Sequence, residues 1–180
     1  MIVSGRDPYE HSTWLMEVMP CLIALPMLWW TRHRFVFTSW VYVLLTVHGL
    51  LLMLGGAYTY ARVPLGFWMQ DWFGWTRNNY DKIGHFAQGF VPAFVAHELL
   101  RRVFHIQGRA LIAFLCISIC LAISAVYEFI EWGSALALGS GANEFLGTQG
   151  YAWDTQSDMF MALIGAVCAV LCFRWHERMF

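Results

Sequence analysis

Three pairs of ionisable residues stand within, or at the mouth of, long apolar runs of the sequence. The members of each pair are three or four positions apart, so both side chains lie on one face of an α-helix. Carboxylate oxygens and imidazole nitrogens bind divalent cations, and carboxylate pairs with a histidine on facing helices form the sites of di-metal helix bundles. The pairs therefore predict a divalent metal ion as cofactor, with the expected ligands Asp81, His85, Glu128, Glu131, Asp154 and Asp158.

The same region is suited to catalysis on an amphiphilic substrate. We expect Glu128 or Glu131 to act as general base toward water or a lipid headgroup, with His85 as a third catalytic group. Lys82 and Arg77 are expected to bind an anionic group of the substrate, such as a phosphate.

Simpler roles are open to several of these residues. Asp81 and Asp154 each precede an apolar run, where aspartate is a good helix N-cap. His85 taken alone fits a packed core histidine. Glu128 lies about two helical turns inside its run, where a solvated rim position does not fit. Elsewhere, Glu98 and Arg102 have the spacing of an ordinary i, i+4 ion pair.

The composition determines the class of protein that must position these residues. Of the 180 residues, 59% are hydrophobic and 13% are charged, and a soluble domain would carry roughly twice that charged fraction. Several apolar runs approach the ~20 residues that a membrane-spanning helix needs. We therefore predict an all-α integral membrane protein with one transmembrane domain, 1–180. Its five expected spans are 14–30, 35–54, 82–103, 109–136 and 154–173.

The segments between the runs predict further features. Pro20 and Pro26 should bend the first span, and Gly55-Gly56 should end the second. Residues 57–80 are rich in aromatic side chains, and Trp68, Trp72 and Trp75 share one helical face, which predicts a segment lying in the headgroup region. The glycine-rich stretch 137–153 is expected to be a loop.

The basic residues predict the orientation in the membrane. Seven of the eleven lysines and arginines fall in three short segments on one side of the five spans, namely Arg32, Arg34, Arg101, Arg102, Arg109, Arg174 and Arg178. By the positive-inside rule the C-terminus is cytoplasmic and the N-terminus external. The three ionisable pairs then lie at the external ends of their helices, near the outer leaflet.

Three motifs resemble a known family. They are 80–86 (YDKIGHF), 127–132 (YEFIEW) and 147–159 (GTQGYAWDTQSDM). In this order they resemble the YjdF-like family of bacterial inner-membrane proteins, and the resemblance covers the chain from about residue 35 onward. It implies a multi-span protein of the bacterial inner membrane and adds no chemistry, because no biochemical activity is established for that family.

A shorter element is similar to a second family. Asp81-Lys82-x-x-His85 resembles VanZ-like membrane proteins, which are linked to glycopeptide resistance. Those proteins carry Glu-x-x-Gln in a later helix, where this chain has Glu128-x-x-Glu131. This partial resemblance implies cell-envelope lipids as the substrate class.

Three functions follow as hypotheses. The first is a metal-dependent membrane enzyme that hydrolyses or transfers a group on a lipid or isoprenoid, with residues 57–80 shaping the substrate entry. The second is a proton or cation transporter with the carboxylates as a relay. The third is a non-catalytic accessory subunit of a larger membrane complex. The expected partners are the lipid bilayer, an amphiphilic lipid substrate and other membrane subunits. A net charge of −1 without a basic arm predicts no nucleic-acid partner.

Overall fold

The computed structural model describes residues 1–138 and 149–180, and within these ranges the chain contains six α-helices and no strand. The helices are α1 (His11–Thr31), α2 (Ser39–Tyr58), α3 (Pro64–Phe73), α4 (Tyr80–Glu98), α5 (Arg109–Leu138) and α7 (Asp154–His176). The all-α class predicted from the sequence is confirmed. The loop expected over 137–153 lies largely outside the described residues.

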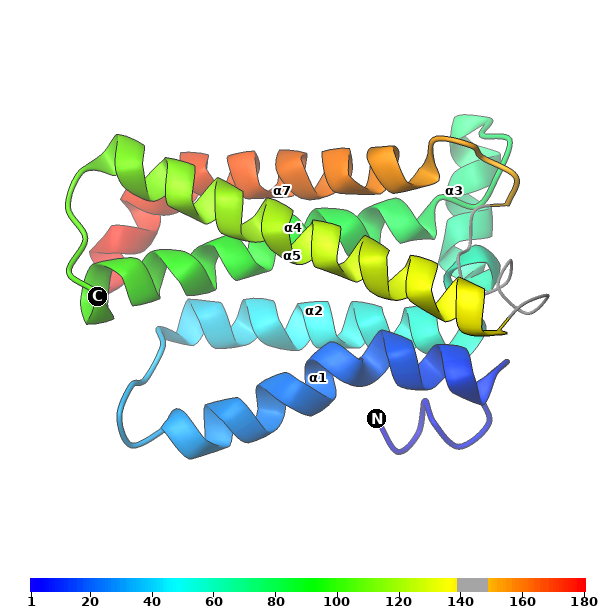
Figure 1. Cartoon of the computed structure of the whole chain (residues 1–180), viewed down its shortest axis with the longest axis horizontal. Coiled ribbons are helices and arrows are strands. Elements are labelled where there is room, and N and C mark those ends of the chain that lie inside the picture. Colours follow the sequence, from blue (N-terminus) through cyan, green and yellow to red (C-terminus); the bar gives the residue numbers. More distant parts are fainter. Residues whose placement is uncertain (139–148) are drawn as a thin grey trace.

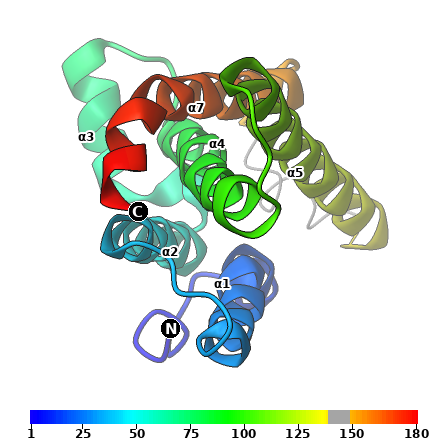
Figure 2. The same ribbon diagram turned by 90° about the vertical axis from the view of Figure 1, so that its left-hand side faces the viewer.

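Five of the helices run side by side as a bundle, and α3 lies across one end of it (Figure 1). Viewed end-on, α4 occupies the centre, with α2, α5 and α7 around it, and α1 packs beside α2 (Figure 2). By length and apolar composition α1, α2, α5 and α7 qualify as membrane spans. Helix α4, which corresponds to the span predicted over 82–103, is not among these candidates, and most of its residues are buried between the other helices.

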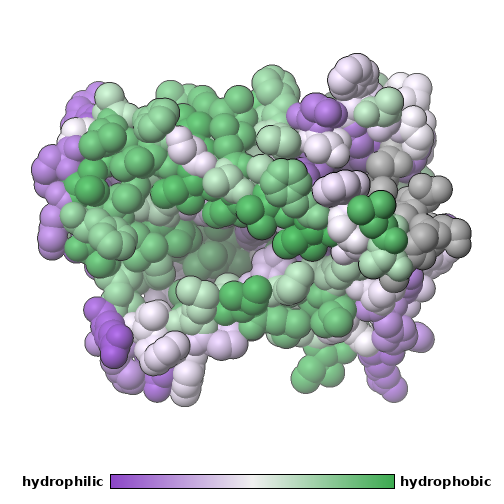
Figure 3. Space-filling model, in the orientation of Figure 1, coloured by the Kyte–Doolittle hydropathy of each residue, from purple (hydrophilic) through white to green (hydrophobic). Residues whose placement is uncertain are grey.

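The outer surface of the bundle is apolar, as expected for contact with lipid. Side chains on the outward faces, among them Phe114, Leu136 and Leu171, are more than half exposed, and hydrophobic residues cover most of the surface seen in Figure 3. The packed core instead gathers toward one end of the bundle, where Val41, Phe94 and other buried residues of α2, α4, α5 and α7 meet.

Helices α4 and α7 approach each other closely at two glycines. A Cβ atom added to Gly89 would lie 1.8 Å from the carbonyl oxygen of Ala162, and one added to Gly165 would lie 2.1 Å from that of Phe86. Small residues at an interface allow backbones to come this close. The contact fixes the first turns of the two helices beside each other.

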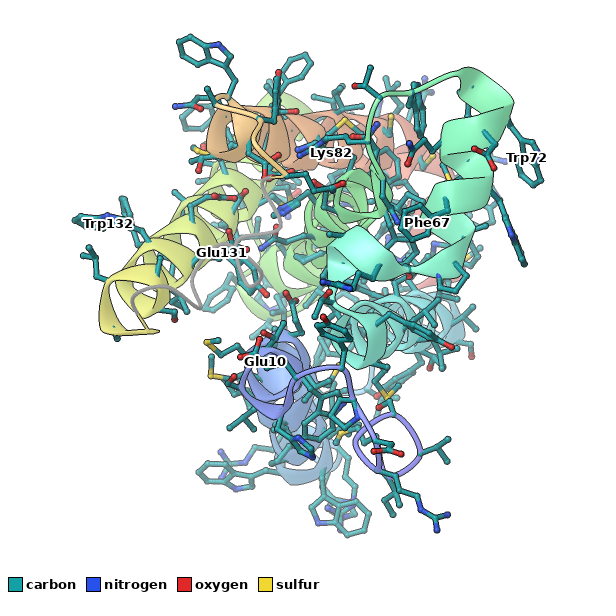
Figure 4. The ribbon with its side chains drawn as sticks, turned by 90° about the vertical axis from the view of Figure 1, so that its right-hand side faces the viewer. Glu10, Phe67, Trp72, Lys82, Glu131 and Trp132 are labelled. Carbon is teal, nitrogen blue, oxygen red and sulfur yellow. The ribbon has the colours of Figure 1, made fainter. Side chains whose placement is uncertain are left out.

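The aromatic segment is partly as predicted. Helix α3 crosses the end of the bundle, and Trp72 on it points away from the protein (Figure 4). Trp68 and Trp72 are both more than half exposed, which suits the headgroup region. The helix ends at Phe73 because Gly74 takes a left-handed conformation with φ +64°. Trp75 therefore lies beyond α3, and its expected place on the same helical face is wrong.

The first two helices also differ in one respect from prediction. Helix α1 bends near its two internal prolines, as expected (Figure 1). Helix α2 continues through Gly55-Gly56 to Tyr58, so the predicted helix end is wrong. A Cβ at Gly55 would lie 2.6 Å from the Tyr60 ring. This glycine therefore serves close packing, not helix termination.

Candidate functional site

The acidic end of the bundle brings together side chains from three helices (Figure 4). The α4–α7 contact places the first turns of both helices in register, and the outer half of α5 lies against them. All members of the resulting group except the two cations are less than a tenth exposed. We call this group the acidic cluster, and it consists of Arg77, Asp81, Lys82, His85, Glu128, Asp154 and Asp158.

Two cations link the three aspartates of the acidic cluster. Lys82 Nζ lies 2.6 Å from Asp158 Oδ1 and 2.9 Å from Asp154 Oδ1. Arg77 Nη2 lies 2.7 Å from Asp81 Oδ2 and 2.8 Å from Asp154 Oδ1. Both side chains expected to bind an anionic substrate group are thus already engaged with carboxylates.

The alternative interpretation of Asp81 and Asp154 as helix N-caps is wrong. The N-cap residues of α4 and α7 are Asn79 and Trp153, and neither makes a side-chain capping hydrogen bond. Asp81 and Asp154 lie within the first turns, where negative charge is favoured by the helix dipole. Their carboxylates hold the cations Arg77 and Lys82 instead.

A second part of the acidic cluster has the donors of a metal site. His85, Glu128 and Asp158 each offer one ligand atom, and these atoms all lie within 4.8 Å of one another. His85 Nε2 is 3.6 Å from Asp158 Oδ1. On its other side, His85 Nδ1 lies 2.9 Å from Gln88 Oε1. A hydrogen bond at the distal nitrogen is what orients a metal-binding histidine.

Glu128 is incompletely satisfied in this arrangement. Its side chain interacts with Thr155, yet its Oε1 atom is buried and has no hydrogen-bond partner among the described residues. A buried carboxylate oxygen without a partner is costly unless a cation or proton joins it. Asp81, Asp154 and Asp158 form the other group of described residues that could hold a metal, but Arg77 and Lys82 bind all three of these carboxylates. In the first group only Asp158 is paired in this way, through Lys82.

Glu131 belongs to neither group of candidate metal ligands, but it lines a cavity together with His85 and Asp158. In Figure 4 it lies on the inner side of α5, whereas Trp132 points away from the bundle. The cavity has a volume of about 160 Å³ and extends from Asp158 and His85 toward Pro20 and Pro92 near the middle of the bundle. Figure 3 shows a hollow between α5 and α1 on this side. The cavity thus connects the metal-type donors with the apolar interior.

The cavity also contains polar residues that the sequence reasoning did not select. Tyr127 donates a hydrogen bond of 2.8 Å to Glu17 Oε2, and Tyr60 also hydrogen-bonds to this carboxylate. Burial, and then the nearby carboxylate, raise the pKa of Tyr60 well above that of free tyrosine, so it remains a donor. His48 lines the same cavity, and its Nε2 has no hydrogen-bond partner among the described residues. Glu17 and His48 could have been selected from the sequence, because each is an ionisable residue inside one of the first two apolar runs.

The opposite end of α4 carries a second buried group, which we call the Glu98 cluster. Its members are Thr38, His97, Glu98, Arg101, Arg102, His176 and Glu177. The Glu98 carboxylate accepts hydrogen bonds from the Thr38 backbone N–H at 3.1 Å, and from Arg102. His176 Nε2 lies 3.0 Å from Glu98 Oε1. The predicted Glu98–Arg102 pair is confirmed, but it belongs to a larger network.

The family of the chain agrees with this membrane architecture. The model of a family described as predicted membrane proteins (DUF2238) matches residues 1–178. The inner membrane protein YjdF of Escherichia coli (strain K12) is 52% identical over 179 residues, covering 99% of this chain and 86% of that protein. No solved structure matches the chain. The resemblance drawn from the three motifs is confirmed. The chain belongs to the DUF2238 family and is a multi-pass protein of the inner membrane.

Proposed function

We propose that this protein is a metal-dependent membrane enzyme that acts on a lipid or isoprenoid substrate near the outer leaflet, within one transmembrane domain. The observation that carries the proposal is the buried, unpartnered Oε1 of Glu128 beside His85 and Asp158. One imidazole and two carboxylates form a suitable set for a divalent cation with open positions for water and substrate. Such a cation would give Glu128 Oε1 a ligand to bind.

The remaining residues have complementary roles in this proposal. Glu131 faces the cavity next to His85 and Asp158, so it is the candidate general base toward a water molecule. A divalent ion held by His85, Glu128 and Asp158 would supply Lewis-acid chemistry at this place. Asp81 and Asp154 hold Lys82 and Arg77 in place. The positive charges of Lys82 and Arg77 would then also attract an anionic headgroup.

The cavity could bind the hydrocarbon part of the substrate. Its surface is mainly apolar, and it reaches from the acidic cluster to Pro20, Leu52 and Ile123. Helices α1 and α5 make few contacts with each other, and the hollow in Figure 3 lies between them. A chain attached to a headgroup could enter sideways from the bilayer by this route.

The proposed orientation puts the N-terminus outside and the C-terminus in the cytoplasm. The seven arginines that indicate it are at the bundle end that carries the Glu98 cluster, opposite to the acidic cluster. Excess positive charge on short segments is retained on the cytoplasmic side. The acidic cluster is then accessible from the outer leaflet, which is where the proposal requires the substrate.

The first test is the metal content of the detergent-purified protein by elemental analysis. We expect a stoichiometric divalent metal in the parent protein and its loss in the Glu128→Ala, Asp158→Ala double variant. A matched control, Asp7→Ala with Asp71→Ala, removes two carboxylates that the acidic cluster does not use and should keep the metal. A folded parent protein that takes up no divalent metal would refute the proposal.

The second test addresses the reaction. The protein is reconstituted in nanodiscs with an extract of inner-membrane lipids and isoprenoid phosphates, and lipids are compared by mass spectrometry with metal and with chelator. We expect one species to be consumed only with metal, and not by the Glu131→Gln variant. Consumption that persists in chelator would contradict the proposed chemistry.

Transport of protons or cations is the second candidate. It is favoured by the line of polar residues along the cavity, including Glu17 and His48. Between the cavity and the Glu98 cluster, however, α4 packs through Val91, Ala93 and Phe94 in the apolar core. Flux into liposomes that disappears in Glu131→Gln would favour transport over catalysis.

A further inference from the structure

A groove with unpaired positive charge lies at the end of the bundle opposite to the acidic cluster. It has a volume of about 350 Å³ and is bounded by the π-helix Leu99–Val103, the start of α5 and the end of α7. Figure 2 looks onto this end, where α5 and α7 meet beside α4. The groove shares no residue with the cavity next to the acidic cluster.

Positive charges outnumber negative charges in this groove. Arg101, Arg109 and Arg174 line it, and Glu177 is its one carboxylate. Glu177 is already paired with Arg101, whose Nη2 lies 2.6 Å from Glu177 Oε1. Arg109 and Arg174 are exposed and form no ion pair with any residue that the structure describes. Two positive charges are therefore available to an outside partner.

The position of Arg109 strengthens this point. It is the first residue of α5, at the helix end where the dipole disfavours a cation. An anion bound there would interact favourably with the dipole and with both arginines. Guanidinium groups bind phosphate oxygens through paired hydrogen bonds.

The rest of the groove is apolar. Ile112, Val170 and Leu171 form its wall, and Leu171 together with Phe114 is exposed on the adjoining outer surface of the bundle. In a membrane these surfaces face acyl chains. A ligand that combines a phosphate with hydrocarbon chains matches both halves of the groove, and basic pockets between membrane helices bind such headgroups.

We propose that this groove binds an anionic phospholipid, with its phosphate between Arg109 and Arg174 and an acyl chain along Val170 and Leu171. The proposal is independent of the metal site and of any catalysis. The lipid would act as a structural ligand that joins the start of α5 to the end of α7.

The test is lipid binding to the detergent-purified full chain, measured by native mass spectrometry. Phosphatidylglycerol should bind at least about tenfold tighter than phosphatidylcholine. The Arg109→Gln, Arg174→Gln double variant should lose that preference, and Arg109→Lys with Arg174→Lys should keep most of it. Arg34→Gln with Arg178→Gln removes equal charge at the same end, outside the groove, and should bind phosphatidylglycerol like the parent.

Three results would overturn the proposal. The first is equal binding of the two lipids by the parent protein. The second is an equal loss in the Arg34, Arg178 control, which would indicate general surface charge. The third is displacement of phosphatidylglycerol by millimolar inorganic phosphate, which would identify a site for free phosphate. Because all substituted arginines are exposed, gel filtration verifies that each variant remains folded.

Discussion

The two buried polar groups of α4 lie in the same bundle and differ in how well their members are satisfied. The Glu98 cluster balances two carboxylates against two arginines, and both oxygens of Glu98 accept hydrogen bonds. The acidic cluster has four carboxylates against two cations, and within residues 1–138 and 149–180 Glu128 Oε1 has no hydrogen-bond partner. A buried network in which every polar atom has a hydrogen-bond partner stabilises a fold. A buried carboxylate oxygen that lacks a partner and lies next to a cavity instead indicates a ligand site.

The surroundings of the two groups also differ, because one group adjoins the packed core and the other adjoins a cavity. The Glu98 cluster adjoins the packed core through Phe94 and Phe173, whose rings contact His176 and His97. The acidic cluster adjoins the cavity instead. We infer that the first group holds helices together and that the second is kept incomplete for a cation and a substrate.

The largest expected effect is on stability at the Glu98 cluster. Glu98→Gln removes the charge that Arg102 and His176 share, and loss of one partner of a buried ionic network should lower the free energy of unfolding by about 3 kcal/mol. Thermal or denaturant unfolding in detergent measures this. A change below about 1 kcal/mol would contradict the structural role, because exposed ion pairs are that weak.

Next in size is a substitution at the contact that assembles the acidic cluster. Gly165→Ala introduces a methyl group 2.1 Å from the carbonyl oxygen of Phe86, and overpacking of this kind should destabilise the protein by about 2–3 kcal/mol. Gly133→Ala is the matched control, since a Cβ there meets nothing within 4 Å. Equal stability of the two variants would contradict the close α4–α7 packing.

A smaller effect is expected inside the cavity. Tyr127→Phe removes the donor to Glu17 and should cost about 1–2 kcal/mol, because a buried carboxylate loses a hydrogen bond. The same substitution at Tyr58, which is exposed, is the control. If both variants unfold at the same denaturant concentration, the Glu17–Tyr127 contact does not stabilise the fold.

The smallest effect is expected at Glu128 without metal. Glu128→Gln replaces an incompletely paired carboxylate, so the unfolding free energy should change by less than about 1 kcal/mol or rise. The same Glu→Gln change should therefore lower the free energy of unfolding strongly at Glu98 and hardly at all at Glu128. A loss as large as that of Glu98→Gln would place Glu128 in a satisfied structural network.

The sequence predicted much of the helical framework because its signals are local. Apolar runs gave the long helices, and i, i+4 spacing correctly placed Asp81 with His85 on one helical face. The approach of α4 to α7 depends on Gly89 and Gly165, which meet only in the folded chain. Glu17 reaches the cavity because α1 packs against α2 and turns Glu17 toward Tyr127 of α5, a contact that no spacing rule predicts.

Errors in prediction arose where tertiary contacts outweighed local preference. Gly55-Gly56 was interpreted as a helix end, yet the glycines continue α2 and make room for Tyr60 and α1. The Glu98–Arg102 pair was interpreted as an ordinary i, i+4 ion pair because its spacing is common. Thr38 and His176, which are distant in sequence, bury it.

The most direct test of a cation at the acidic cluster is the unfolding midpoint of the purified protein during titration with Mg²⁺, Mn²⁺ or Zn²⁺. Binding to the folded state alone should raise the unfolding free energy by about 2.7 kcal/mol at one hundred times the dissociation constant. We predict this rise for the parent protein and for the Asp7→Ala, Asp71→Ala control, and its absence in Glu128→Gln. Failure of all three cations to stabilise the parent, or equal stabilisation of Glu128→Gln, would contradict a metal site at His85, Glu128 and Asp158.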